Sequence, residues 1–326
     1  MDKLLRVYAV KHKDPNVRAA SRSGGIFTAI SDKILSEGGS VFGCILSDDF
    51  LAYHVKATTY EQRDKMRGSK YIQSNMGDVF RDVKVELDSG RLVLFTGTSC
   101  QVDGLKSFLG KDYVNLLCID IVCHGVPSPK VWLEYLKWQE KKNKKRIVSV
   151  NFRNKTDFGW AAHKETLYTS DGSSISSEVF KELFYKHNIL RPSCYECKYK
   201  HIYHPGDITI ADYWGIDKAC PGFNDNKGVS LVLINSEKGE EYFDDVSGSL
   251  EYRMTDINNS LQPALQKPFP CPITRDQFWK DLKVKDFDYI AKEYGGLLTP
   301  FQEFVLKWKN RAKKVLKLII GKGASK

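Results

Sequence analysis

The chain has 326 residues, of which 42% are hydrophobic and 28% are charged, the composition of a folded globular protein. It has no run of the roughly 18 to 20 apolar residues that cross a bilayer and no cleavable leader, so we expect a cytoplasmic protein without membrane spans. The formal net charge is +10, with much of the excess at 141–146 and after Lys307. No recognition helix or interleaved aromatic pattern accompanies these charges, so nucleic-acid binding is not expected.

Strand and helix patterns alternate over residues 1–145. Short apolar runs predict strands, and longer runs with helical periodicity that close at glycine predict helices. Strands are expected over residues 40–46, 51–57, 91–97 and 114–123, and helices over residues 25–38 and 100–110. This part is therefore expected to be an α/β domain on a mixed sheet. In such sheets the loops after strands build the site, and Cys100 and Cys123 both follow predicted strands.

Residues 146–270 carry further strand patterns, in "RIVSVNF", "DITIAD" and "GVSLVLIN", which predict a second, β-rich part. We expect this part to be the iron–sulfur and substrate part. From residue 271 to 326 the pattern turns helical and ends in a basic tail. The fold class expected is α/β (α+β), with an N-terminal mixed-sheet domain, a β-rich part and C-terminal helices.

The tail from residue 304 to residue 326 has basic but no acidic residues, and bulky apolar residues at helical spacing. One interpretation is a terminal helix that docks its apolar face on the main domain. The other is a basic amphipathic helix on an anionic membrane surface, which would place the protein peripherally at the inner face of a membrane.

Cys194 and Cys197 form a C-x-x-C pair, a spacing that serves a redox dithiol, a zinc site or an iron–sulfur cluster. The dithiol is disfavoured because the pair precedes a loop rather than a helix. Zinc is a local alternative, since His201 and His204 follow, although the short gap between Cys197 and His201 would cramp a tetrahedral site.

The other cysteines divide into two groups. Cys100 and Cys123 lie in glycine-containing loops after strands, where backbone amides can stabilise a thiolate. With Cys194 and Cys197 they make four thiolates, which suit a [4Fe–4S] cluster. The remaining four are expected to be buried structural thiols: Cys44, Cys118, Cys220 and Cys271.

Two loops suit a flavin. Gly24 and Gly25 precede a predicted helix, with Ser23 as its N-cap, and a helix start with bare backbone favours a pyrophosphate. A capping turn without a ligand is the alternative. The loop at 67–74 offers Ser69, Lys70, Tyr71 and Gln73 for charge, stacking and hydrogen bonds, with a solvated loop as the alternative.

Seven motifs in order over roughly residues 5–235 resemble the coenzyme F420 hydrogenase/dehydrogenase beta-subunit family. They are "SGGIFTA", "GSKYIQS", "LFTGTSCQVDGLKSFL", "IDIVCHGVPSPKVW", "CYECKYK", "DITIADYWG" and "GVSLVLIN". The resemblance implies an oxidoreductase that passes electrons from an external donor through a [4Fe–4S] cluster and FAD to an organic acceptor.

The resemblance also implies roles for individual residues. The cluster ligands would be Cys100, Cys123, Cys194 and Cys197. The flavin would contact Ser23, Gly24, Gly25, Thr28, Ser69, Lys70, Tyr71, Gln73, Gly97 and Thr98. His124 and Lys70 are the predicted catalytic residues. His124 would act as a proton donor or as a hydrogen-bond partner of the cluster, and a purely structural histidine is the alternative.

This sequence departs from relatives that carry a ferredoxin-like segment, because no such cysteine run precedes Ser21. The expected electron donor is therefore a separate ferredoxin-like protein or a reduced cofactor. The chain is similar to stand-alone members encoded among surface-polysaccharide biosynthesis genes, which implies a glycan intermediate as substrate. The alternatives are a subunit that reduces or oxidises F420, and a non-catalytic zinc scaffold of a glycan assembly complex.

Overall fold

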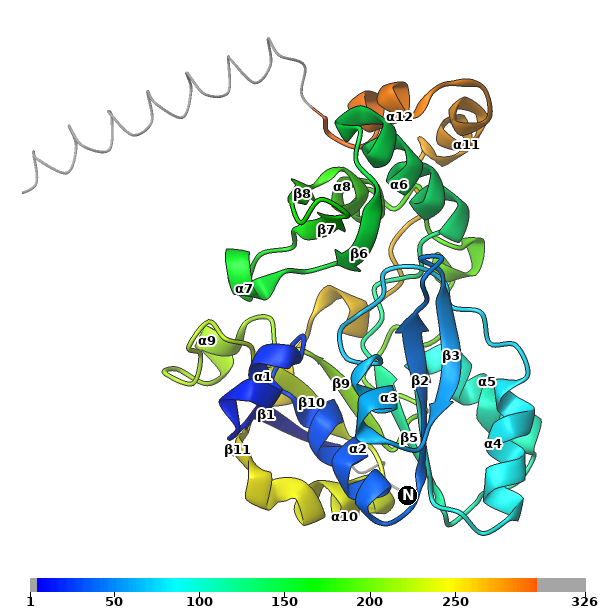
Figure 1. Ribbon diagram of the computed structural model, residues 1–326. Coiled ribbons are helices and arrows are strands. Elements are labelled where there is room, and N and C mark those ends of the chain that lie inside the picture. The colour runs from blue at the N-terminus through cyan, green and yellow to red at the C-terminus, as the bar shows by residue number, and fades with distance from the viewer. Residues whose placement is uncertain (1–4, 298–326) are drawn as a thin grey trace, which may run out of the picture.

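The computed structural model describes residues 5–297, in which two sheets are flanked by helices (Figure 1). The large sheet has the strand order β11-β1-β10-β9-β5-β4-β2-β3. Its strands are β1 (Arg6–His12), β2 (Ser40–Leu46), β3 (Ala52–Ala57), β4 (Val93–Thr98), β5 (Leu116–Ile121), β9 (Ile208–Asp212), β10 (Ser230–Ile234) and β11 (Leu250–Met254). The pairs from β2 through β4 and β5 to β9 are parallel, and the outer pairs are antiparallel. This mixed sheet confirms the expected α/β fold class.

Helices cover both faces of the large sheet, because its central strands alternate apolar side chains between the two faces. Leu117 packs in one core cluster with Ile30, whereas the next residue, Cys118, packs in another with Val83. The first cluster lies under α2 (Ile26–Ser36) and α10 (Glu237–Val246), and the second under α4 (Val79–Asp88) and α5 (Ser99–Leu109).

The small sheet packs with helices above the large one in Figure 1. Its strands are β6 (Ile147–Asn151), β7 (Glu165–Thr169) and β8 (Ser174–Ser177). Its core is aromatic and includes Trp132, Phe180 and Phe278. The helices around it are α6 (Pro129–Asn143), α8 (Val179–Tyr185), α11 (Arg275–Val284) and α12 (Phe287–Glu293). Shorter helices connect the rest: α1 (Pro15–Ala20), α3 (Tyr60–Asp64), α7 (Lys155–Phe158) and α9 (Ile216–Ala219).

The elements predicted over residues 25–123 are present, with ends within two residues of those expected. The division at residues 145 and 146 does not separate the two sheets, because β9, β10 and β11 complete the large sheet. As a domain boundary it stays a prediction. The basic tail at 304–326 lies outside the described residues. Within residues 5–297, no helix is long and apolar enough to cross a membrane.

Candidate functional site

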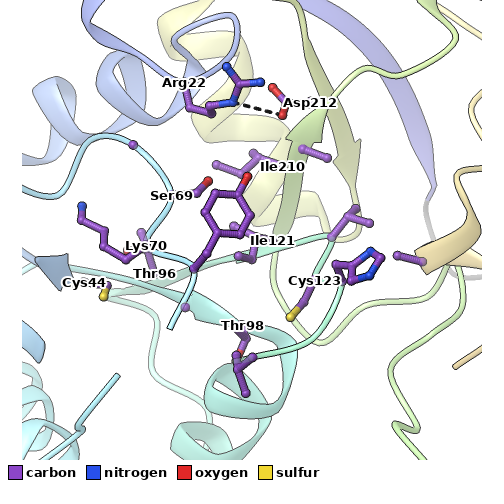
Figure 2. Close-up of a pocket in the computed structure, with 18 of the residues that line it drawn as sticks. Arg22, Cys44, Ser69, Lys70, Thr96, Thr98, Ile121, Cys123, Ile210 and Asp212 are labelled. Atoms are coloured by element: carbon purple, nitrogen blue, oxygen red, sulfur yellow. Dashed lines mark ion pairs between the residues drawn. The ribbon is translucent and has the colours of Figure 1, made fainter. Parts of the chain in front are cut away.

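A cavity of about 610 Å³ lies at the carboxyl ends of the parallel strands (Figure 2). Its lining includes Thr98, Ile121 and Asp212, the last residues of β4, β5 and β9. Parallel strands bring their carboxyl ends to one edge of a sheet, which is the usual place for a ligand. Arg153 and Tyr185, from the small-sheet region, complete the wall. The volume is that of a site for an organic ligand.

The cavity brings together most of the residues that the sequence assigned to a flavin. They are Ser23, Gly25, Ser69, Lys70, Tyr71, Gln73, Gly97 and Thr98. Gly24 and Thr28 are not among its lining residues. A Cβ on Gly24 would lie 2.0 Å from the carbonyl oxygen of Val10, so this glycine is required by close chain packing. Thr28 is buried, and its hydroxyl accepts a hydrogen bond from Arg67 Nε at 3.2 Å.

The turn before α2 differs from the expected capping turn. Gly25 is the N-cap, with a left-handed φ of 100° that favours glycine. Ser23 was wrongly predicted to cap the helix: its hydroxyl donates instead to the Val229 carbonyl at 2.6 Å. This bond ties the turn to the segment that enters β10 and leaves the backbone of Gly25 at the cavity wall.

Lys70 lines the cavity but its ammonium is bound by the chain itself. Its Nζ donates to the carbonyl oxygens of Lys65, Met66 and Arg67 at 3.0, 2.9 and 3.0 Å. Burial lowers the pKa of Lys70 to about 8. Its neighbour Tyr71 packs against the ring of His163, with ring centroids 4.9 Å apart. Lys70 therefore closes the end of α3, and Tyr71 forms part of an aromatic wall.

The four candidate ligand cysteines come from three segments. Cys100 and Cys123 line the cavity, whereas Cys194 and Cys197 are not among its lining residues. Burial raises the pKa of Cys123 to about 12, the charge of Lys200 lowers it, and the charges of Cys194 and Cys100 raise it. Burial also raises the pKa of Cys194, to which Cys197 and Cys100 add. Cys194 is thus within electrostatic reach of the other three sulfurs, and Cys100 is within reach of Cys123.

No three His, Cys, Asp or Glu side chains in residues 5–297 are placed to hold one metal ion. His204 Nδ1 lies 3.0 Å from both Ser99 Oγ and Asp120 Oδ2, whereas its buried Nε2 has no hydrogen-bond partner among the described residues, so the zinc alternative stays a prediction. Of the four cysteines predicted to be buried thiols, Cys118 and Cys220 are buried and Cys44 is partly exposed. Cys271 is exposed, so that prediction was wrong, because its proline-flanked segment lies at the surface.

His124 lines the cavity within a group of rings. It stacks on Phe269 with centroids 4.1 Å apart, and its Nε2 lies 2.9 Å from His187 Nε2. Burial lowers the pKa of His124 to about 3, with smaller contributions from His187 and Lys200. The imidazole is therefore neutral at physiological pH, and one of the two facing nitrogens must carry the shared proton.

The sequence reasoning missed an ionic group in the same cavity. Arg153 Nη1 donates to Asp212 Oδ2 at 2.9 Å, and Arg22 Nε lies 3.4 Å from the same oxygen. Figure 2 shows the Arg22–Asp212 pair on the side of the pocket away from Thr98 and Cys123. Arg22 directly precedes "SGGIFTA" and Asp212 is the last residue of "DITIAD", so both lie at motifs that the sequence makes visible. No sequence pattern marked Arg153 as a site residue, since only folding brings it to the cavity.

Comparisons with known proteins agree with this architecture. No curated protein matches the chain. It is similar in fold to a chain from the F420-reducing [NiFe] hydrogenase complex of Methanosarcina barkeri, with a TM-score of 0.55 and 19% identity, over 77% of this chain and 82% of that chain. The sequence model for the C-terminal part of the coenzyme F420 hydrogenase/dehydrogenase beta subunit matches residues 90–260, more than half of the chain. The protein therefore belongs to the coenzyme F420 hydrogenase/dehydrogenase beta-subunit family, and is a redox protein of that kind.

Proposed function

We propose that this protein is an oxidoreductase that holds FAD beside a [4Fe–4S] cluster and moves electrons from an external donor to an organic acceptor. One observation carries the proposal. A single cavity is lined both by Cys100 and Cys123 and by the loops assigned to the flavin, which are far apart in the sequence. This shared lining supports a flavin held beside the cysteines.

The surroundings of the cysteines fit thiolate ligands. Burial raises the pKa values of Cys123 and Cys194, and backbone hydrogen bonds at Gly125 and Val126 partly oppose this rise, as donors to a thiolate do. The ammonium of Lys200 contacts the carbonyl oxygen of Cys123 and also opposes the rise in the pKa of its thiol. A cube of four irons is wider than one ion, so its ligands stand further apart than those of zinc. The mutual influence of the thiols supports a shared site, since Cys100 and Cys194 act on Cys123, and Cys100 and Cys197 act on Cys194.

The chain's own residues would perform the binding and orienting. The backbone amides at Gly25 suit a pyrophosphate, and the Ser69 and Gln73 side chains suit the polar parts of a flavin. When bound, the cluster supplies one-electron transfer and the flavin supplies two-electron transfer to an organic acceptor. Tyr71 packs against His163 and Phe184 and would shield this part of the cavity from water.

The acceptor is proposed to be a small organic molecule, with a surface-polysaccharide intermediate as the first candidate. F420 is the second, because the chain of similar fold comes from an F420-reducing hydrogenase complex. The donor is proposed to be a separate ferredoxin-like protein or a reduced cofactor.

The test is anaerobic purification with determination of iron, sulfide and flavin. We expect a yellow-brown protein with four irons per cluster. Cys123→Ala should lose most of its iron, since an incomplete set of thiolates binds a cube poorly, and so should the equivalent changes at Cys100, Cys194 and Cys197. Cys271→Ala is the matched control, because Cys271 is exposed, and should keep its iron. A colourless protein with one zinc per chain, or full iron in Cys123→Ala, would exclude the proposal.

A further inference from the structure

Two arginines in the cavity wall have hydrogen-bonding capacity that the protein leaves unused. The Arg22 side chain is 9% exposed and the Arg153 side chain is 5% exposed. Among the described residues, six buried side-chain nitrogen or oxygen atoms lack a hydrogen-bond partner, and three of them belong to these arginines: Arg22 Nη1, Arg153 Nε, and Arg22 Nε, which makes only the 3.4 Å ion-pair contact with Asp212. Buried donors are normally satisfied, because an unpaired one costs about 1–3 kcal/mol. This concentration of unpaired donors indicates a missing acceptor.

The charge at this place is also incomplete. Both guanidinium groups face the same Asp212 oxygen, so two positive charges share one negative charge. The other Asp212 oxygen accepts a hydrogen bond from Trp160 Nε1 at 2.8 Å. Lys155 lies near enough to respond to this group, since burial and then the charges of Arg22 and Arg18 lower its pKa to about 8, while Asp212 and Asp225 partly oppose this. A buried excess of positive charge is costly unless an anion joins it.

Aromatic side chains form an accessible side beside the two arginines. The Arg153 guanidinium lies over the Trp214 ring at 5.0 Å, and Trp214 stacks on Trp160 with centroids 5.0 Å apart. Trp214 and Tyr185 line the cavity and are 38% and 44% exposed. A molecule that must enter and leave needs such an open side, whereas a resident cofactor is held enclosed. Trp214 and Tyr185 also lie outside the loops assigned to the flavin.

We propose that Arg22 and Arg153 form an oxyanion subsite that binds a phosphate or carboxylate group of the organic acceptor, with Trp214 and Tyr185 contacting its apolar part. The planar fork of a guanidinium matches both anions and binds them through paired hydrogen bonds. Asp212 holds the two arginines in place and limits the net charge, so the site takes one oxyanion and releases it again. The inference deepens the proposed oxidoreductase function, because it restricts the acceptor to anionic molecules.

The test uses inorganic phosphate as the probe and the full chain as purified. Binding is measured by calorimetry and by the fluorescence of Trp160 and Trp214, neither of which needs turnover. Arg153→Met should weaken phosphate binding about tenfold or more, the effect of losing a charged hydrogen-bonding partner. Asp212→Asn should bind phosphate several-fold more tightly, since it removes the competing negative charge and keeps an oxygen for Trp160. Arg81→Met is the matched control, because Arg81 is exposed and pairs with Asp78, and should bind as the wild type does.

The opposite signs of these two variants separate a binding role from a structural one, which would weaken both. If Arg153→Met fails to fold, tighter phosphate binding by Asp212→Asn still distinguishes the binding role from the structural one. The absence of saturable phosphate binding, or weaker binding in Asp212→Asn, would overturn the proposal. So would phosphate that competes with FAD for the flavin-stripped chain, because the arginines would then bind the cofactor's pyrophosphate. Normal phosphate binding in a protein without flavin or iron would instead overturn the proposed function and leave the subsite standing.

Discussion

The buried carboxyl group of Glu165 should make the free energy of unfolding depend on pH. Its carboxyl group is buried in the small-sheet region and accepts a hydrogen bond from Tyr135 Oη at 3.0 Å. Burial raises the pKa of Glu165 from 4.5 to about 7, and the bond from Tyr135 only partly opposes this. The folded state therefore holds a proton that the unfolded state has already released between these two pH values.

The sign and size follow from this difference. A carboxyl group with a raised folded-state pKa contributes stability that is fully present below pH 4.5 and is lost as the pH rises through about 7. Each pH unit between the two pKa values is worth about 1.4 kcal/mol, so the loss is roughly 3 kcal/mol. Glu165→Gln removes the titration and keeps an oxygen for Tyr135. The difference in free energy of unfolding between the variant and the wild type should therefore shift by roughly 3 kcal/mol in favour of the variant from the low end to the high end of this pH range.

The assay is urea unfolding at about pH 4.5 and about pH 8, which compares the free energies of unfolding of the two proteins. Glu134→Gln on α6, where the side chain is only partly buried, serves as the control and should show no such change with pH. If the difference between Glu165→Gln and the wild type is the same at both pH values, Glu165 does not hold its proton in the folded state and the reasoning is refuted.

Three further predictions concern stability and the role of Lys70. Gly24→Ala should unfold the protein or lower its Tm sharply, since the added Cβ would lie 2.0 Å from a backbone oxygen. Gly172→Ala is the comparison, because Gly172 has a φ of 80° but open space around it, and thermal unfolding should show a loss of only about 1 to 2 kcal/mol in the free energy of unfolding. Trp132→Ala should lower the free energy of unfolding in urea by about 3–5 kcal/mol, because this fully buried ring is lost from the small-sheet core; a loss under 1 kcal/mol would contradict that packing. Lys70→Met should reduce stability by about 1–3 kcal/mol through three orphaned carbonyl groups while flavin content is unchanged. Lost flavin at unchanged stability would instead make Lys70 a phosphate ligand.

The sequence by itself determined the local elements and the chemistry carried by short motifs. The strands β2 to β5 and the helices α2 and α5 were predicted because alternation and helical periodicity are local signals. The family resemblance was confirmed for the same reason, since its motifs are short and contiguous. The turn before α2 shows the limit: Ser23 has the right residue type for a cap, but Val229, about two hundred residues away, takes its hydroxyl.

Only the tertiary structure decided which strands are neighbours and which side chains meet. Strands β9 to β11 join the large sheet because backbone pairing and apolar burial act between segments far apart in the chain. The same long-range pairing brings Arg153, which follows β6, to Asp212 at the end of β9 and to Arg22 before α2. No periodicity or spacing encodes that meeting, because the free energy that holds it comes from burial and ion pairing in the folded chain alone. The same holds for Lys70, whose charge was visible in the sequence but whose carbonyl partners were not.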